Sequence, residues 1–228
     1  MAQRLIKLMR TCRQHYDHTY TEGLNVCAQP WKNGWGSGGL YACELRHLFV
    51  WIHLYPDITE VAWVEVPADA QVARFPTKIK ASALVLTGFM PIAEAVALAI
   101  QGGVDVHANN DYALHWASKF GHLPVVEVLV KAGANVHADK DYALRMASYY
   151  GHLPVVEFLV QAGADVHAVD DYALRKASSS GHLPIVKFLV TAGANVHTDD
   201  EALYMASKNG HLPVVEFLVT AGATTEQD

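Results

Sequence analysis

The sequence predicts a small α+β domain over residues 1–88, followed by an all-α solenoid of helical repeats over residues 90–228. The first observation is self-similarity with a period near thirty residues from Asp111 onward. The second is a non-repetitive N-terminal part that holds four of the five tryptophans and all three cysteines. The third is composition: 51% hydrophobic and 18% charged residues provide enough apolar surface for a folded protein with two cores.

Apolar patterning in residues 1–88 predicts one helix and five strands. The helix is expected at Glu44–Tyr55, with a buried stripe of Leu45, Leu48, Phe49 and Ile52. The strands are expected at Arg4–Met9, Leu24–Cys27, Leu40–Cys43, Ile58–Val66 and Lys78–Leu86. Between strands, the glycine-rich run Gly34–Gly39, beside Trp31, is expected to be a flexible loop that either cradles a ligand or lets the chain turn.

The segment Ala81–Val104 is long and apolar enough to resemble a membrane span. However, Gly88 and Pro91 divide it, and Glu94 would lie in hydrocarbon without an obvious partner. We therefore expect a strand that runs into a short helix, and no membrane association.

The repetitive part begins with a half repeat at 90–110 and continues with full repeats at 111–140, 141–170, 171–199 and 200–228. Each full repeat predicts two helices. In the first repeat, one helix spans about Tyr112–Lys119, and the second starts at Leu123 with a proline in its first turn and ends before Gly133. Helices this short are marginal alone in water, so neighbouring repeats must stack.

Each full repeat contains the same series of short motifs, with minor changes. In the first repeat these are Ala117-Ser118, Gly121-His122-Leu123, Val125-Val126-Glu127, Leu129-Val130 and Ala132-Gly133-Ala134-Asn135-Val136. The units resemble ankyrin repeats over about sixty per cent of the chain. They depart from that family at Tyr112-Ala113-Leu114-His115, where it has Thr-Pro-Leu-His, and in a period shortened from about 33 residues, so the geometry of the family's β-hairpin finger stays open.

The N-terminal part carries a second resemblance. Its motifs Tyr20-Thr21-Glu22-Gly23-Leu24-Asn25, Gly38-Gly39-Leu40-Tyr41 and Val66-Pro67-Ala68-Asp69-Ala70 are similar to the domain that precedes ankyrin repeats in many proteins of giant amoeba-infecting viruses. This resemblance implies an architecture, not a reaction.

Residues that differ between copies of one repeat are not required by packing, so they are candidates for partner recognition. They are expected on one face of the first helices, which in ankyrin repeats is the concave binding surface. The predicted partner-binding residues are Trp116, Phe120, Arg145, Met146, Tyr149, Tyr150, Arg175, Lys176, Tyr204 and Met205. The alternative is that these side chains only cover neighbouring apolar surface.

Acidic residues recur at the turns, at Asp139, Asp141, Asp170, Asp171, Asp199, Asp200 and Glu201. If this row is functional, it attracts a partner with a basic surface; otherwise the residues only stabilise turns. The chain has nine Lys/Arg against seven Asp/Glu up to Phe89 and eight against sixteen from Met90 onward, balances of +2 and −8. A nucleic-acid partner is therefore not expected.

Eight of the thirteen histidines occupy two repeat positions, at His107, His137, His167, His197, His122, His152, His182 and His211. Equivalent positions on stacked repeats lie ~8–10 Å apart, too far for imidazoles to share one zinc ion at ~2.1 Å. We expect structural turn and cap histidines, with no metal and no cofactor.

An enzymatic alternative rests on Tyr41. The order Gly-Leu, then Gly-Gly-Leu-Tyr41, then a helix and an apolar strand is similar to the NAD-binding core of poly(ADP-ribose)-polymerase-like transferases, in which such a tyrosine stacks on nicotinamide. The first-strand His-Gly of that family is absent here. An ADP-ribosyltransferase-like domain whose repeats recruit the substrate therefore stays open, beside the main prediction of a viral adaptor protein that is not an enzyme.

Two further expectations concern location and assembly. Three unpaired cysteines and an N-terminus without a continuous apolar stretch predict a protein of the host cytoplasm that is not secreted. The last repeat keeps the interior motif Val214–Val219, so Val215, Leu218 and Val219 are expected to be partly exposed, which would permit weak self-association while the oligomeric state stays open.

Overall fold

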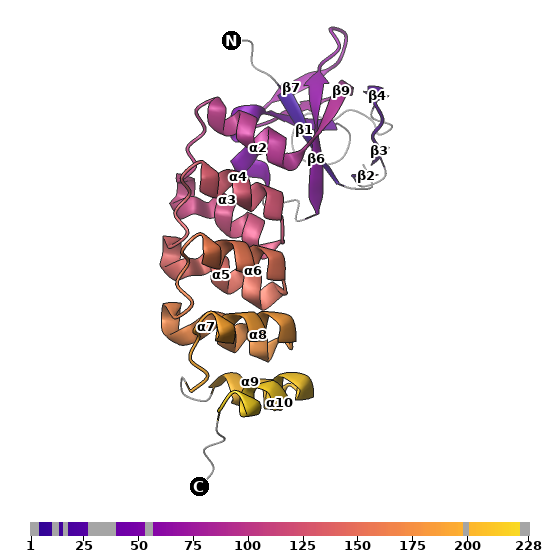
Figure 1. The fold of residues 1–228 in the computed structure, drawn as a ribbon. Helices are drawn as coiled ribbons and strands as arrows, with labels where there is room; N and C mark the ends of the chain where they lie inside the picture. The colour runs from indigo at the N-terminus through magenta and orange to yellow at the C-terminus, as the bar shows by residue number, and fades with distance from the viewer. Residues whose placement is uncertain are drawn as a thin grey trace. The chain divides into compact units, whose positions relative to one another are not determined.

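A computed structural model of the chain describes residues 5–10, 14–15, 18–26, 40–52, 57–197 and 201–223. The chain divides into two compact units, residues 1–105 and 106–228, which are taken in turn (Figure 1). Within the described residues, no helix has the length and apolarity that crossing a bilayer requires.

The N-terminal unit is built on a seven-stranded antiparallel sheet with strand order β4-β9-β6-β1-β5-β8-β7. The strands are β1 (Leu5–Arg10), β4 (Gly23–Val26), β5 (Leu40–Glu44), β6 (Ile58–Glu65), β7 (Val72–Arg74), β8 (Ile79–Ala81) and β9 (Ala83–Pro91). A separate two-stranded ribbon joins β2 (Gln14–His15) and β3 (His18–Thr19). The helical elements are η1 (Leu45–His47), α1 (Leu48–Trp51) and α2 (Ile92–Gln101).

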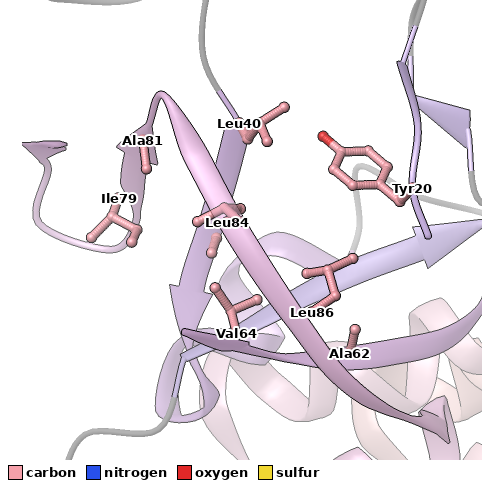
Figure 2. Close-up of a cluster of buried hydrophobic side chains, with 9 residues drawn as sticks. Tyr20, Leu40, Ala62, Val64, Ile79, Ala81, Leu84 and Leu86 are labelled. Carbon is pink, nitrogen blue, oxygen red and sulfur yellow. The ribbon is translucent and has the colours of Figure 1, made fainter. Parts of the chain in front are cut away.

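A cluster of buried side chains covers one face of this sheet (Figure 2). Leu40 of β5 is paired with Ala81 of β8, and Ala42 with Ile79, so all four side chains point to the same side. Leu84 and Leu86 of β9, Ala62 and Val64 of β6, and Tyr20 complete the cluster. Helix α2 packs against β6, β9 and η1 and buries Ile92, Ala95, Val96 and Ala99. The sheet is thereby given a hydrophobic core.

Several sequence expectations for this unit need correction. The helix expected at Glu44–Tyr55 is a 3₁₀ turn followed by the short α1, and residues 53–56 lie outside the described ranges. The strand expected at Lys78–Leu86 is two strands that break at Ser82. Ser82 donates its N–H to the Gln71 carbonyl, and its hydroxyl accepts the Gln71 N–H, each at 2.9 Å. Before this break β8 pairs with β5 and β7, and after it β9 pairs with β4 and β6. The strand and helix expected over Ala81–Val104 are present as β9 and α2.

The C-terminal unit consists of helix pairs (Figure 1). The first helices are α3 (Ala108–Lys119), α5 (Ala138–Tyr150), α7 (Ala168–Ser179) and α9 (Glu201–Lys208), and the second helices are α4 (Leu123–Lys131), α6 (Leu153–Gln161), α8 (Leu183–Thr191) and α10 (Leu212–Thr220). Each first helix packs on its own second helix and on the next first helix, while second helices contact each other in sequence. Each repeat therefore buries its apolar face against its neighbours. Helix α2, from the expected half repeat, groups with the N-terminal unit.

Left-handed turns open three of the first helices. The residues Asn109–Asp111, Asp139–Asp141 and Val169–Asp171 all have φ between 51° and 60°. Non-glycine residues in this conformation cost about 1–2 kcal/mol each, so three in a row need compensating interactions. No strand occurs among the described residues of this unit. These three repeats therefore have a left-handed turn at the place of the family's β-hairpin finger, whose geometry was left open above.

Candidate functional site

The predicted partner-binding residues lie on the first helices, but they differ in accessibility. Tyr149 and Tyr150 of α5 are 41% and 43% exposed, and Tyr204 of α9 is exposed as well. Six others are half-buried: Phe120, Arg145, Met146, Arg175, Lys176 and Met205. We call the accessible side chains of α3, α5, α7 and α9 beyond the left-handed turns the first-helix face.

Trp116 is a correction to the predicted set, because its side chain is 3% exposed and offers almost no surface to a partner. The indole stacks on the His122 ring with centroids 4.7 Å apart and lies 5.8 Å from the ring of Phe120. The i, i+4 spacing placed Trp116 and Phe120 on one side of the helix, but the ring of His122, the residue before the second helix, stacks on the indole, whereas Phe120 stays half-buried. Trp116 supports Phe120 instead of contacting solvent.

An aromatic cluster spans the first two full repeats. The rings of Tyr149 and Tyr150 meet edge to face at 4.8 Å. The Lys119 ammonium lies 5.2 Å from the Phe120 ring centroid and 5.4 Å from that of Tyr150, and so links α3 to α5. These four residues form a patch of aromatic surface that contains one cation.

A second row of rings and cations runs along the first helices. The His115 ring lies 4.8 Å from that of Tyr142, and the Arg145 guanidinium lies between Tyr142, at 5.2 Å, and Tyr172, at 5.1 Å. Arg175 lies 5.3 Å from the Tyr172 ring centroid. Comparison between repeats does not single out Tyr142 and Tyr172, because a tyrosine occupies this position in three of the four full repeats. The available signal was the Tyr–Arg spacing of three residues, which brings the two side chains together on a helix.

The two arginines also stabilise the left-handed turns. Arg145 donates from Nε to the Lys140 carbonyl at 3.0 Å and from Nη2 to the Asp139 carbonyl at 2.8 Å. Arg175 makes the equivalent bonds to the carbonyls of Asp170 and Val169, each at 2.9 Å, and pairs with Glu201. Arg145 and Arg175 therefore have a structural role in the turns, in addition to any role in recognition.

Two members of the predicted acidic row, Asp141 and Asp171, are buried and used inside the protein, so they do not add to an exposed negative stripe. Asp141 is buried; its carboxylate accepts the N–H of Asp165 at 2.8 Å and lies 3.0 Å from Nδ1 of His137. Asp111 and Asp171 repeat this arrangement, so each links its own turn to the next one. Asp199 and Asp200 fall outside the described ranges. In the described part of the row, Asp139 and Asp170 stay exposed beside the paired Glu201.

The histidines of the repeats make structural contacts. Nε2 of His152, His182 and His211 lies 2.9–3.0 Å from the carbonyl oxygens of Lys119, Tyr149 and Ser179 in the preceding repeat. Burial lowers the pKa of His115 and of His152, which keeps both rings neutral to lower pH. The described residues contain no group of His, Cys, Asp and Glu side chains arranged to hold a metal ion.

Tyr41, the residue of the enzymatic alternative, lies on β5 with its ring against lysines. The Lys78 ammonium is 4.2 Å from the Tyr41 ring centroid and 4.7 Å from that of Trp51. Burial, followed by the charge of Lys80, lowers the pKa of Lys78. A nicotinamide stacked on this face of Tyr41 would have to displace the Lys78 side chain. The glycine-rich loop before Tyr41 lies outside the described ranges.

Two other titratable groups are buried in the N-terminal unit. The Lys7 ammonium donates to the Tyr41 carbonyl at 3.1 Å and lies 4.2 Å from the Tyr20 ring centroid. Burial lowers the pKa of Lys7 to about 7, and burial raises the pKa of the Cys43 thiol to about 12. A thiol with this pKa stays protonated at neutral pH and is a poor nucleophile.

The C-terminal repeat leaves less apolar surface open than expected. Leu218 is fully buried, which corrects the expectation for this residue, whereas Val215 is half-buried and Val219 of α10 is 53% exposed, as expected. Leu212 at the start of the same helix is also exposed. Self-association through this end stays a prediction.

Comparison with known proteins locates the repeats within a family. The family model described as ankyrin repeats (3 copies) matches residues 89–170 and again residues 147–228, which together make up more than half of the chain. A putative ankyrin repeat protein of Acanthamoeba polyphaga mimivirus is 34% identical over 125 residues, corresponding to 50% of this chain and 40% of the relative. The chain thus aligns with less than half of that relative's length.

Proposed function

The chain belongs to the ankyrin-repeat family, in the type carried by giant amoeba-infecting viruses, and from this premise we propose that it is a viral adaptor whose repeats bind a host or viral protein. In this proposal the repeats form a solenoid over residues 90–228, and the first-helix face is its concave contact surface. The adaptor acts in the host cytoplasm. The N-terminal domain, expected from the sequence at residues 1–88, engages a second molecule.

One observation carries the proposal: the cluster of Phe120, Tyr149 and Tyr150 around Lys119 presents aromatic rings at the surface of two adjacent repeats. Tyrosine is enriched among the residues that dominate binding energy at interfaces, because a large ring orders few torsions on binding. Tyr149 and Tyr150 have no counterpart in the third repeat, where Ser179 and Ser180 occupy the equivalent positions. Packing of the repeat therefore does not require them.

The test measures the affinity of a captured partner for single variants of the full chain. A partner isolated from infected-cell lysate is purified, and its binding is measured by calorimetry. Tyr149→Ala and Tyr150→Ala are expected to weaken binding by more than about 1 kcal/mol each, as truncation of an interface anchor does. Lys131→Ala and Gln161→Ala, at exposed positions of the second helices, are the matched controls and should leave the affinity unchanged. Equal losses in the controls would move the contact surface to the second helices.

The enzymatic alternative is separated by a different measurement. The purified chain is incubated with labelled NAD, alone and with the captured partner. Incorporation of label that is lost in Tyr41→Ala would replace the adaptor proposal with an ADP-ribosyltransferase. We expect no Tyr41-dependent incorporation, because the Lys78 ammonium already lies over one face of the Tyr41 ring and would have to be displaced by a nicotinamide stacked there.

A further inference from the structure

We propose that the first-helix face binds a segment of its partner protein that is rich in aspartate and glutamate. This inference rests on the proposed function and specifies the partner's chemistry. It replaces the basic partner expected from the acidic turns, and the contacts described below explain why.

The sign of charge on the first-helix face differs from that of the whole repeat region. Beyond the left-handed turns, the described residues of α3, α5, α7 and α9 include five Lys/Arg and one acidic residue, Glu201, which pairs with Arg175. The exposed or half-buried glutamates Glu127, Glu157 and Glu216 lie on the second helices. The negative balance of the region therefore resides on other surfaces.

All five cations lie against aromatic rings, and three of them are lysines. The Lys119 ammonium lies between Phe120 and Tyr150, as described above. The Lys176 ammonium is 4.9 Å from the Tyr172 ring centroid, and that of Lys208 is 5.7 Å from the Tyr204 ring centroid. In the part of the chain that the structure describes, none of the three forms an ion pair with a carboxylate.

A lysine held in this way is suited to bind an anion. The ring positions the ammonium and shields one side of it from water, while its N–H donors stay available for charge-assisted hydrogen bonds. A carboxylate that approaches finds the positive charge not yet neutralised. Aromatic surface beside each cation can at the same time pack against apolar side chains of the same segment.

Part of the negative charge at the described turns is already used inside the protein. Asp111, Asp141 and Asp171 are buried and accept hydrogen bonds within the protein. Of the exposed acidic pair, Asp139 is followed directly by the exposed Lys140. Among the described residues, a basic partner would therefore meet Asp139 and Asp170 at the turns, with Lys140 beside Asp139, and repulsion from the first-helix face.

The distance between the cations suggests the length of the bound segment. Lys119 and Lys208 occupy the same position in the first and fourth full repeats, three repeat steps apart. At ~8–10 Å per step this is roughly 24–30 Å, which an extended peptide covers with about 7–9 residues at ~3.3 Å each. A segment of about this length can contact all three lysines.

The experiment selects peptides from a random phage-display library against the immobilised full chain. The displayed peptides have about 12 residues, which exceeds the length estimated for the bound segment. The test variant is Lys119→Gln/Lys176→Gln/Lys208→Gln. The matched control is Lys131→Gln/Lys187→Gln, which removes two exposed lysines from the second helices. Circular dichroism establishes that both variants are folded. The dominant peptide is then synthesised, and its affinity is measured by fluorescence anisotropy at low and high salt, next to a single-stranded RNA oligonucleotide of similar length.

We expect enrichment of acidic peptides on the wild-type chain and on the control. Binding of the synthetic peptide should weaken at least about tenfold in the triple variant and at high salt, and change less than about twofold in the control. Enrichment of neutral or basic peptides that still depend on Tyr150 would overturn the acidic partner and leave the interaction module in place. Selection of no peptide would count against both proposals, and tighter binding of the RNA would overturn the proposed protein segment.

Discussion

A histidine–glycine contact joins successive repeats and can be tested with an internal control. The ring of His211 lies over Gly181 of the preceding repeat, where a Cβ atom would come within 2.6 Å of Nδ1 and 2.8 Å of Cε1. The same ring donates from Nε2 to the Ser179 carbonyl at 3.0 Å. His152 and His182 cover Gly121 and Gly151 in the same manner. A methyl group at Gly181 therefore has to displace the ring and break its hydrogen bond.

Gly210 separates this contact from the effect of backbone conformation. Gly181 and Gly210 both have a φ of 75°, but a Cβ atom at Gly210 would meet nothing within 4 Å. Alanine at either position costs about 1–2 kcal/mol for the left-handed backbone. Gly181→Ala additionally loses the histidine hydrogen bond, about 0.5–1.5 kcal/mol, and the packing of the displaced ring. We expect Gly181→Ala to lower the free energy of unfolding by about 1–2 kcal/mol more than Gly210→Ala does.

Urea unfolding followed by far-ultraviolet circular dichroism measures both free energies. A third comparison places Gly181→Ala in a His211→Ala background, where the ring is absent and the glycine substitution should cost no more than at Gly210. A double-mutant cycle then yields the coupling between the two residues. Equal losses for the two glycines, or an undiminished loss without the histidine ring, would refute the interlocking contact.

Three further predictions concern buried polar groups. The Ser148 hydroxyl is fully buried without a hydrogen-bond partner among the described residues. Ser148→Ala should therefore raise the free energy of unfolding by about 1 kcal/mol, measured as a higher urea midpoint, and a lower midpoint would contradict this. Burial lowers the pKa of His115 below its usual 6.5, so the unfolded chain takes up the proton first and stability should fall as pH drops through that value. His115→Phe should flatten this acid dependence, measured as urea midpoints across pH, and an unchanged slope would assign it to other groups. The pKa of Lys7 falls from 10.5 to about 7, so the N-terminal unit should gain stability as pH rises between these values. Lys7→Met should remove that slope and raise stability at neutral pH. Unfolding of this unit is measured by tryptophan fluorescence, because four of the five tryptophans lie in it. A slope that persists in the variant would show that Lys7 does not cause it.

The repeat architecture was readable from the sequence because its signals are local. Proline in the first turn of each second helix and glycine after its last turn determine where those helices begin and end, whatever surrounds them. Four near-identical copies also show which positions packing requires. In the N-terminal unit, apolar runs predicted β1, β4, β5 and β6 near their observed bounds. They did not predict β7, the β2–β3 ribbon, the strand order or the break at Ser82, because pairing joins segments that are distant in the chain.

The accessibility of the candidate surface was decided by tertiary structure. Helical spacing places Trp116 and Phe120 on one side of the first helix, yet in the folded chain Trp116 is buried and stacks on His122, whereas Phe120 stays half-buried beside Lys119. Likewise, the sequence shows an aspartate at every turn but not that Asp141 points inward to the N–H of the next turn. Burial and hydrogen bonding depend on which residues of another repeat come within a few ångströms, and spacing along one helix does not contain that information.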